Sequence, residues 1–155
     1  DPYYQGLSSP YSCKDGPFIT PEELILVKGM KRELLYGEEG RAGLINYLST
    51  FSDGKINVNT APPIILQTLS DGIDEVIADT IVFYRERAPF LSPEDLQKVP
   101  GITPEVYEEI KDYITTKSSV FSIRVEGEVR DIRRAVLMVV RRDPIGFSTL
   151  FWRAE

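Results

Sequence analysis

The sequence contains no histidine and only one cysteine, Cys13. Zinc sites and Ser-His or Cys-His catalysis normally depend on those residue types, so enzymes of these classes are not expected. Cys13 has no second cysteine for an internal disulfide, and we interpret it either as a buried small apolar residue or as a thiol left without a partner by trimming. We therefore predict that the chain is not an enzyme.

The sequence also lacks a long apolar run. Runs such as residues 135–140 are far shorter than the roughly 20 residues that a membrane-spanning helix needs. Because the chain begins at Asp1 without an initiator methionine or a targeting stretch, we expect it to be a processed or trimmed piece of an anchored protein. Its 155 residues, 42% of them hydrophobic, suffice for a globular core.

Positive charge is scarce in the middle of the chain, and the formal net charge is −6. Residues 66–117 carry eleven acidic and five basic side chains, whereas residues 121–155 carry seven arginines and five acidic residues. An acidic body with a mildly basic C-terminal part is not typical of a surface that binds phosphate backbones. We therefore expect no nucleic-acid partner.

One motif occurs twice, at an offset of 72 positions. The first copy, residues 16–30, begins GPFITPEEL, and the second copy, residues 88–102, begins APFLSPEDL. In both, a hydroxyl residue precedes a proline and an acidic residue follows, which is typical of a capped helix start. Gly29 and Gly101 then stand where a left-handed residue ends a helix. The sequence thus predicts the same helical turn twice.

Further elements are predicted from periodicity and capping. Apolar residues at helical spacing predict a helix over residues 74–87, and a Thr-Pro pair predicts another over residues 103–113. Residues 37–41 are typical of a loop, and residues 44–49 of a short helix.

The segment KINVNTAPP, residues 55–63, lies between the two copies. We interpret it as a short strand followed by a helix that Thr60 caps. Asn57 and Asn59 could suggest a binding site, but asparagine at such a handover usually bonds to nearby backbone groups. We therefore expect a structural role for both.

The C-terminal part alternates between apolar and polar residues. Residues 121–126 predict a strand, and Gly127 predicts a turn or bulge. Residues 130–142 predict a second strand, whose apolar centre indicates cover on both faces. After a turn at residues 143–146, residues 147–152 predict a third strand. Together they predict a three-stranded antiparallel meander.

These elements predict an α+β fold. A helical domain would occupy residues 1–117 and contain the internal duplication of residues 16–30 and 88–102, each copy like a helix-turn-helix of the SAM or helix-hairpin-helix kind. An antiparallel sheet would occupy residues 118–155.

Two families have similar motifs. Residues 54–112 resemble helix-hairpin-helix DNA-binding modules of the competence-protein type, which share the NVNTA, Tyr-Arg and Val-Pro-Gly-Ile patterns. The general secretion pathway protein K family resembles almost the whole chain, from the tyrosines of residues 1–11 through both copies and INVNTA to the strands of residues 121–142. Because its coverage is larger and in the right order, we favour the resemblance to these minor pseudopilins of type II secretion.

That resemblance implies a pilin-like protein with a membrane-spanning N-terminal helix, which these residues do not include. It implies a periplasmic globular part at the pseudopilus tip, where it caps or initiates the fibre and contacts the I and J minor pseudopilins. An isolated domain would be a monomer. Some members of the family bind calcium, although no dense calcium-binding loop is visible here and no ligands are assigned. We expect the sheet face that the helix would cover to be apolar and exposed.

Candidate contact residues lie at the two ends of the chain. Three tyrosines near the N-terminus could pack against their own domain or form a contact surface, and arginines that flank the second strand could line a solvated edge or a partner patch. The predicted partner contacts are Tyr3, Tyr4, Tyr11, Arg133, Arg141 and Trp152.

Nucleic-acid binding is the alternative function. A helix-hairpin-helix binds phosphate through the backbone amides of a Gly-x-Gly turn with lysine or arginine nearby. The turn at residues 71–74 places a carboxylate at the second glycine position, and in residues 101–104 a proline removes an amide. Acidic residues follow that second turn, so we expect phosphate to be repelled.

Overall fold

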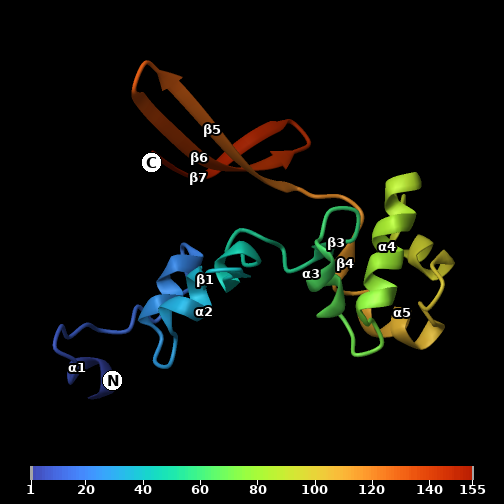
Figure 1. Cartoon of the computed structure of the whole chain (residues 1–155), viewed down its shortest axis with the longest axis horizontal. Helices are drawn as coiled ribbons and strands as arrows, with labels where there is room; N and C mark the ends of the chain where they lie inside the picture. Colours follow the sequence, from blue (N-terminus) through green and yellow to red (C-terminus); the bar gives the residue numbers. More distant parts are fainter. Residues whose placement is uncertain (1, 155) are drawn as a thin grey trace. The chain divides into compact units, whose positions relative to one another are not determined.

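The computed structural model describes residues 2–154, so Asp1, which the family resemblance included, lies outside the described residues. The fold is mixed helix and strand, as predicted (Figure 1). The chain divides into two compact units, residues 1–50 and 51–155, and each is described by itself. The predicted domain boundary between residues 117 and 118 stays a prediction. None of the helices among the described residues has the length and apolar composition needed to span a bilayer.

The first unit consists of short elements. They are α1 (Pro2–Gln5), the 3-10 helix η1 (Pro21–Leu26), α2 (Arg32–Tyr36), β1 (Gly37–Glu38), β2 (Arg41–Ala42) and the 3-10 helix η2 (Leu44–Asn46). The predicted loop at residues 37–41 is instead an antiparallel hairpin of β1 and β2, and the predicted helix at residues 44–49 is a single 3-10 turn. Within residues 2–50, Leu35 is the only large apolar side chain that is fully buried.

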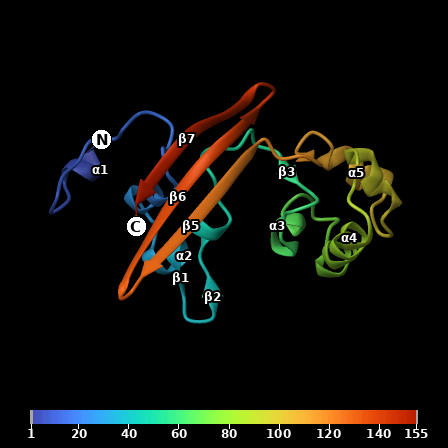
Figure 2. The same ribbon diagram turned by 90° about the horizontal axis from the view of Figure 1, so that it is seen from above.

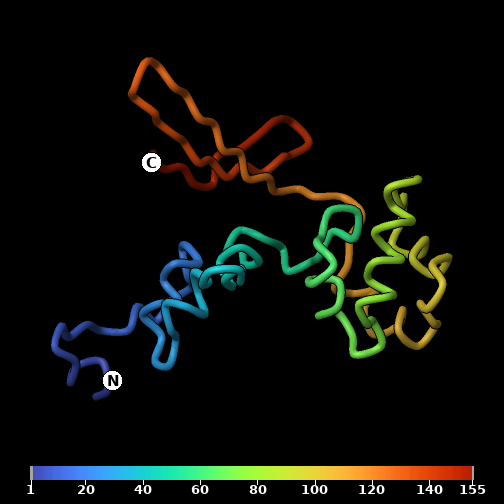
Figure 3. The backbone as a smooth tube through the Cα atoms, viewed as in Figure 1, coloured from blue at the N-terminus to red at the C-terminus, as the bar shows by residue number. Residues whose placement is uncertain are grey.

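The second unit begins with a helical part. Its elements are β3 (Ile56–Asn57), α3 (Pro63–Gln67), α4 (Glu75–Arg87), the 3-10 helix η3 (Pro93–Lys98), α5 (Pro104–Ile110) and β4 (Ile114–Thr115). Figure 3 traces the path of the backbone through these short segments. The helix predicted over residues 74–87 is confirmed, and the Asp74 carboxylate caps it by accepting from the Ile77 amide at 2.9 Å.

Two helix predictions need correction. α5 starts at its predicted position but ends at Ile110, because Ile114 leaves the helical path and pairs with Ile56 in the parallel ladder β3–β4. α3 is not capped by Thr60. Proline keeps the preceding residue extended, so the Pro62-Pro63 pair places the N-cap at Pro62 and the helix start at Pro63.

The core of the helical part is one apolar cluster. It gathers residues from every helical element of the second unit, and its fully buried members include Val58, Leu66, Ile81, Leu96 and Ile110. The Arg85 guanidinium donates to the carbonyls of Val58 and Ala61 at 2.9 and 2.7 Å, which joins α4 to the segment after β3. Burial lowers the pKa of this guanidinium from its ordinary value.

The C-terminal sheet confirms the predicted meander. The strands β5 (Val120–Val129), β6 (Ile132–Asp143) and β7 (Gly146–Ala154) pair antiparallel in the order β5-β6-β7 (Figure 2). The prediction of a turn or bulge at Gly127 was wrong, because Gly127 pairs with Arg134 inside the ladder. The chain turns later, where Arg130 adopts a positive φ of 55°, so the second strand starts two residues after its predicted start.

Candidate interaction surfaces

One face of the C-terminal sheet is apolar and exposed, and we call it the apolar face. Registered partners lie on the same face of a sheet, so the pairs Ile123–Met138 and Met138–Trp152 mark one side. Because the register shifts between Val139 and Val140, Phe147 also lies on this side, where it pairs with Arg142. Trp152 is 65% exposed. The other exposed apolar side chains of the apolar face are Phe121, Ile123, Val125, Val129, Ile132, Val136 and Phe147.

The opposite face is more polar and partly covered, and we call it the charged face. Arg133 donates to the Glu128 carboxylate at 2.8 Å, and Arg124 pairs with Glu126. The Phe51 ring lies 5.9 Å from the Phe151 ring on β7. The composition of β6 had indicated that its centre is covered on both faces. In the structure the two faces are not equally covered. The expected exposed apolar face agrees with the structure.

The structure separates the predicted contact residues of the sheet. Trp152 lies on the apolar face, whereas Arg133 and Arg141 occupy alternate positions of β6 on the charged face. They therefore do not form one patch. The predicted contacts include Trp152 but not the seven other exposed side chains of its face. The alternation of β5 was a signal for four of them, whereas those on β6 and β7 also require the strand register.

The predicted tyrosines gather on the first copy of the repeat. The Tyr4 hydroxyl accepts from the Lys28 amide at 3.1 Å, and the Tyr11 hydroxyl donates to the Leu26 carbonyl. The rings of Tyr3 and Tyr11 each lie 5.0 Å from that of Tyr4. Burial, followed by the neighbouring tyrosines, raises the pKa of Tyr11. Tyr4 and Tyr11 thus pack against their own unit, while Tyr3 is more exposed.

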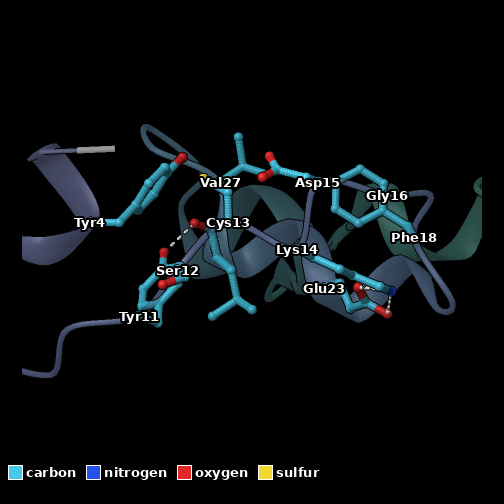
Figure 4. A pocket seen from close by; sticks show the side chains of 11 residues that line it. Tyr4, Tyr11, Ser12, Cys13, Lys14, Asp15, Gly16, Phe18, Glu23 and Val27 are labelled. Carbon is cyan, nitrogen blue, oxygen red and sulfur yellow. Dashed lines mark hydrogen bonds and ion pairs between the residues drawn. The ribbon is translucent and has the colours of Figure 1, made fainter.

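A hollow of about 270 Å³ lies between this tyrosine segment and the first copy (Figure 4). Its lining is mostly apolar and includes Tyr4, Tyr11, Phe18, Leu26 and Val27. The hollow was not predicted from the sequence. The two copies share one motif, and the motif gives no sign that the first copy is open where the second is buried.

An ion pair closes one side of the hollow. Lys14 and Glu23 pair at 2.9 Å, and the same carboxylate accepts from the amides of Ile19 and Thr20. Lys14, followed by the Ile19 amide, lowers the pKa of Glu23. The acidic side chain is therefore already occupied as part of the helix cap.

Asn57 and Asn59 have the structural role that was predicted. The Asn57 side chain accepts from the Asn59 amide at 2.9 Å, which is the expected local bond. The Asn59 side chain reaches further: it donates to the carbonyls of Phe90 and Thr116 and accepts from the Phe90 amide. It fixes the start of the second copy to the segment between the copies.

The described residues do not fit a calcium site built from acidic side chains. Calcium takes roughly six to eight oxygen ligands, several of them usually carboxylates. Within residues 2–154, no group of three or more cysteine, aspartate and glutamate side chains is placed to hold a metal ion. No ligand is therefore assigned to the calcium that the family resemblance implies for some members.

Comparisons with known proteins agree with this fold. The helix-hairpin-helix motif model matches residues 52–115. No curated protein sequence matches the chain. A chain in the crystal structure of the GspK-GspI-GspJ complex from the enterotoxigenic Escherichia coli type 2 secretion system is similar, with a TM-score of 0.70 and 19% sequence identity.

That alignment covers 100% of this chain and 54% of the other. The chain therefore spans about half the length of its structural neighbour. The likeness confirms the predicted fold class and supports, at the level of the fold, the resemblance found in the sequence.

Proposed function

We propose that this chain is part of a K-type minor pseudopilin of a type II secretion system. The observation that carries the proposal is the shared fold over the full chain with a chain of the GspK-GspI-GspJ complex. On this proposal the globular part lies on the periplasmic side of the inner membrane. It assembles at the pseudopilus tip by contacts with the I and J pseudopilins, and it catalyses no reaction.

The apolar face supports this proposal. Its exposed aromatic and branched side chains, including Phe121, Phe147 and Trp152, lie on one side of three strands, and the Arg142 guanidinium lies over the Phe121 ring among them. Such surfaces normally mark an interaction, because each large side chain loses roughly 1.5–3 kcal/mol by staying in water. In the pilin-like architecture that the resemblance implies, an anchoring N-terminal helix lies on the sheet. We propose that such a helix covers this face in the whole protein.

The absence of an enzymatic role is also part of the proposal. The chain has no histidine, and two of its carboxylates with a lowered pKa, Glu23 and Asp95, serve as helix caps: each accepts from two backbone amides. Surface complementarity is then the mechanism, and the charged face and the exposed Tyr3 offer polar contacts for it.

The proposal is tested by mixing this chain with the soluble domains of the I and J pseudopilins from the same source and measuring mass by light scattering after size exclusion. We expect a stable complex with one copy of each protein. A parallel run replaces J by a major pseudopilin domain, which should not join. If three separate peaks elute at micromolar concentration, with and without calcium, the proposal is wrong.

A second candidate, nucleic-acid binding, is favoured by the helix-hairpin-helix match over residues 52–115. The turn of the second copy opposes it, because Thr103 uses its side chain to cap α5 and Pro104 has no amide to donate. Glu105, Glu108 and Glu109 then follow. Retention of the chain on immobilised duplex DNA at low salt would support this candidate, and we expect none.

A further inference from the structure

The two copies of the repeat have the same local structure. η1 and η3 both begin with a capping box, formed by Thr20 with Glu23 and by Ser92 with Asp95. Both turns then end at a glycine with positive φ, 89° at the first and 96° at the second. The likeness continues past the motif, because α2 starts 72 residues before α5.

What covers the two copies differs. Phe90 and Val99 of the second copy are 7% and 1% exposed, whereas their counterparts Phe18 and Val27 are 44% and 39% exposed. The surroundings of Gly29 and Gly101 differ in the same way. A β-carbon on Gly101 would meet the Ile77 side chain of α4 at 2.7 Å, whereas one on Gly29 would meet nothing within 4 Å.

Helix α4 is the element that the first copy lacks. In the second unit, Ile77, Ile81 and Tyr84 of α4 belong to or pack against the same cluster as Val99. Residues 3–15 precede the first copy by the same spacing that places α4 before the second. Instead of a long helix, however, they contain the end of α1, a turn and irregular chain. The hollow is open beside Phe18 and Val27, the residues whose counterparts α4 helps to bury.

We propose that a helix from the part of the same polypeptide that precedes residue 2 packs on the first copy in the position that α4 takes on the second. It would place a branched aliphatic side chain over Gly29 and an apolar side chain in the hollow. Its expected pattern is that of α4, with branched residues four apart and an aromatic residue three further along, as at Ile77, Ile81 and Tyr84.

Two observations favour a segment of the same chain over another occupant. The structural neighbour is nearly twice as long as the region matched here, so a protein of that length has further residues to supply such a helix. The described N-terminal end already lies on the first copy: Tyr4 binds the Lys28 amide, and the Lys28 ammonium lies 4.4 Å from the Tyr3 ring centroid. A preceding segment needs only a short connection to reach Gly29.

The apolar chemistry of the hollow favours an apolar side chain as its occupant. Its volume of about 270 Å³ is close to the lower end of the roughly 300–1,000 Å³ of small-molecule pockets. Of its three charged residues, Lys14 and Glu23 form an ion pair with each other, and Asp15 is the third. The inference rests on the proposed function only in taking the whole protein to be as long as its neighbour.

Hydrogen exchange measured by mass spectrometry tests the inference in the full-length protein in detergent and in residues 1–155. We expect peptides within residues 18–30 to exchange at least about tenfold more slowly in the full-length protein, because docking must be undone before they open. Peptides within residues 90–102 should exchange equally in both. Val27→Asp in the full-length protein should remove the added protection, whereas the control Ile145→Asp in the exposed β6–β7 turn should leave it.

Three outcomes would overturn the inference. Residues 18–30 could exchange equally in the two proteins, or they could gain protection only when the I and J domains are added. Protection that rises with the concentration of residues 1–155 alone would instead assign the hollow to a second copy. The wild-type comparison requires no variant to fold. Complex formation with the I and J domains is scored separately, so a failure of the proposed function would not be mistaken for a failure of this inference.

Discussion

The first and second copies of the repeat share a sequence pattern and a backbone but not an environment. Capping boxes and left-handed glycines form in both. Only the second copy is buried in an apolar cluster that includes the long helix α4 of its own unit. The comparison teaches that capping chemistry sets a turn locally, whereas burial depends on elements far away in the sequence.

The energetic consequence is an uneven stability. Each large side chain moved from water into a core contributes roughly 1.5–3 kcal/mol, and Phe90, Leu96 and Val99 all receive this contribution. Phe18 and Val27 receive only part of it. We therefore expect the first copy to open at a lower free energy than the second when residues 1–155 are studied alone.

The largest difference should come from truncating the equivalent leucines. Leu96 is fully buried, so Leu96→Ala should lower the free energy of unfolding by roughly 2–5 kcal/mol through lost burial and a cavity. Leu24→Ala, at a half-buried position, should cost about 1 kcal/mol. Urea unfolding followed by circular dichroism measures both. Equal losses would show that the two copies do not differ in environment.

Substituting the two glycines should give the next largest contrast. Gly29→Ala forces a side chain into a left-handed backbone, at a cost of roughly 1–2 kcal/mol. Gly101→Ala carries the same strain and also pushes against Ile77, which adds roughly 1–3 kcal/mol. The pair can be compared by thermal unfolding. A larger effect at Gly29 would mean that an unseen element already packs there.

Removing the link between the second copy and the segment that follows β3 should have a smaller effect. Asn59→Ala deletes the side-chain bonds to Phe90 and Thr116 and should cost roughly 1–3 kcal/mol. Asn46→Ala, which removes one bond to the Gly43 carbonyl in the first unit, is the matched control and should cost less. Chemical denaturation measures the loss of unfolding free energy in both variants. A neutral Asn59→Ala would remove the role assigned to this residue.

The smallest effect should be a dependence on acid pH. The Lys98 side chain, followed by the amides of Ser92 and Leu91, lowers the pKa of Asp95 from 3.8 to about 2. A carboxylate with a lowered folded pKa stabilises the fold above its unfolded pKa, and this contribution is lost as pH falls from about 4 towards 2. Asp95→Asn should make the free energy of unfolding depend less on pH between about 4 and 2, as measured by urea unfolding at several pH values. An unchanged pH dependence would exclude Asp95 as a stabilising cap.

Local signals in the sequence predicted local structure. The capped starts of η1 and η3, the long helix α4 and the alternating strands of the meander all follow from residues within one segment. The parallel ladder β3–β4 joins Ile56 to Ile114, and no short window contains both residues. The Pro62-Pro63 pair could have corrected the Thr60 cap, because proline constrains its neighbour within the same window.

The candidate surfaces were predictable to the same extent. Trp152 was named from sequence, and its face follows from strand alternation once the register is known. The predicted tyrosines do lie together, but the hollow beside them depends on the helix that is missing next to Phe18 and Val27. A cavity of this kind reflects absent tertiary cover, which leaves no mark in the motif itself.

The proposed function is tested most directly by deleting the gene for this protein from its source bacterium and measuring where the exported proteins accumulate. The account predicts that they remain in the periplasm, and that the full-length gene returns them to the medium, whereas a gene carrying both Phe121→Asp and Trp152→Asp restores less export than a control carrying Ile145→Asp. Export to the medium at the level of the undeleted strain would contradict the assignment to a type II secretion system.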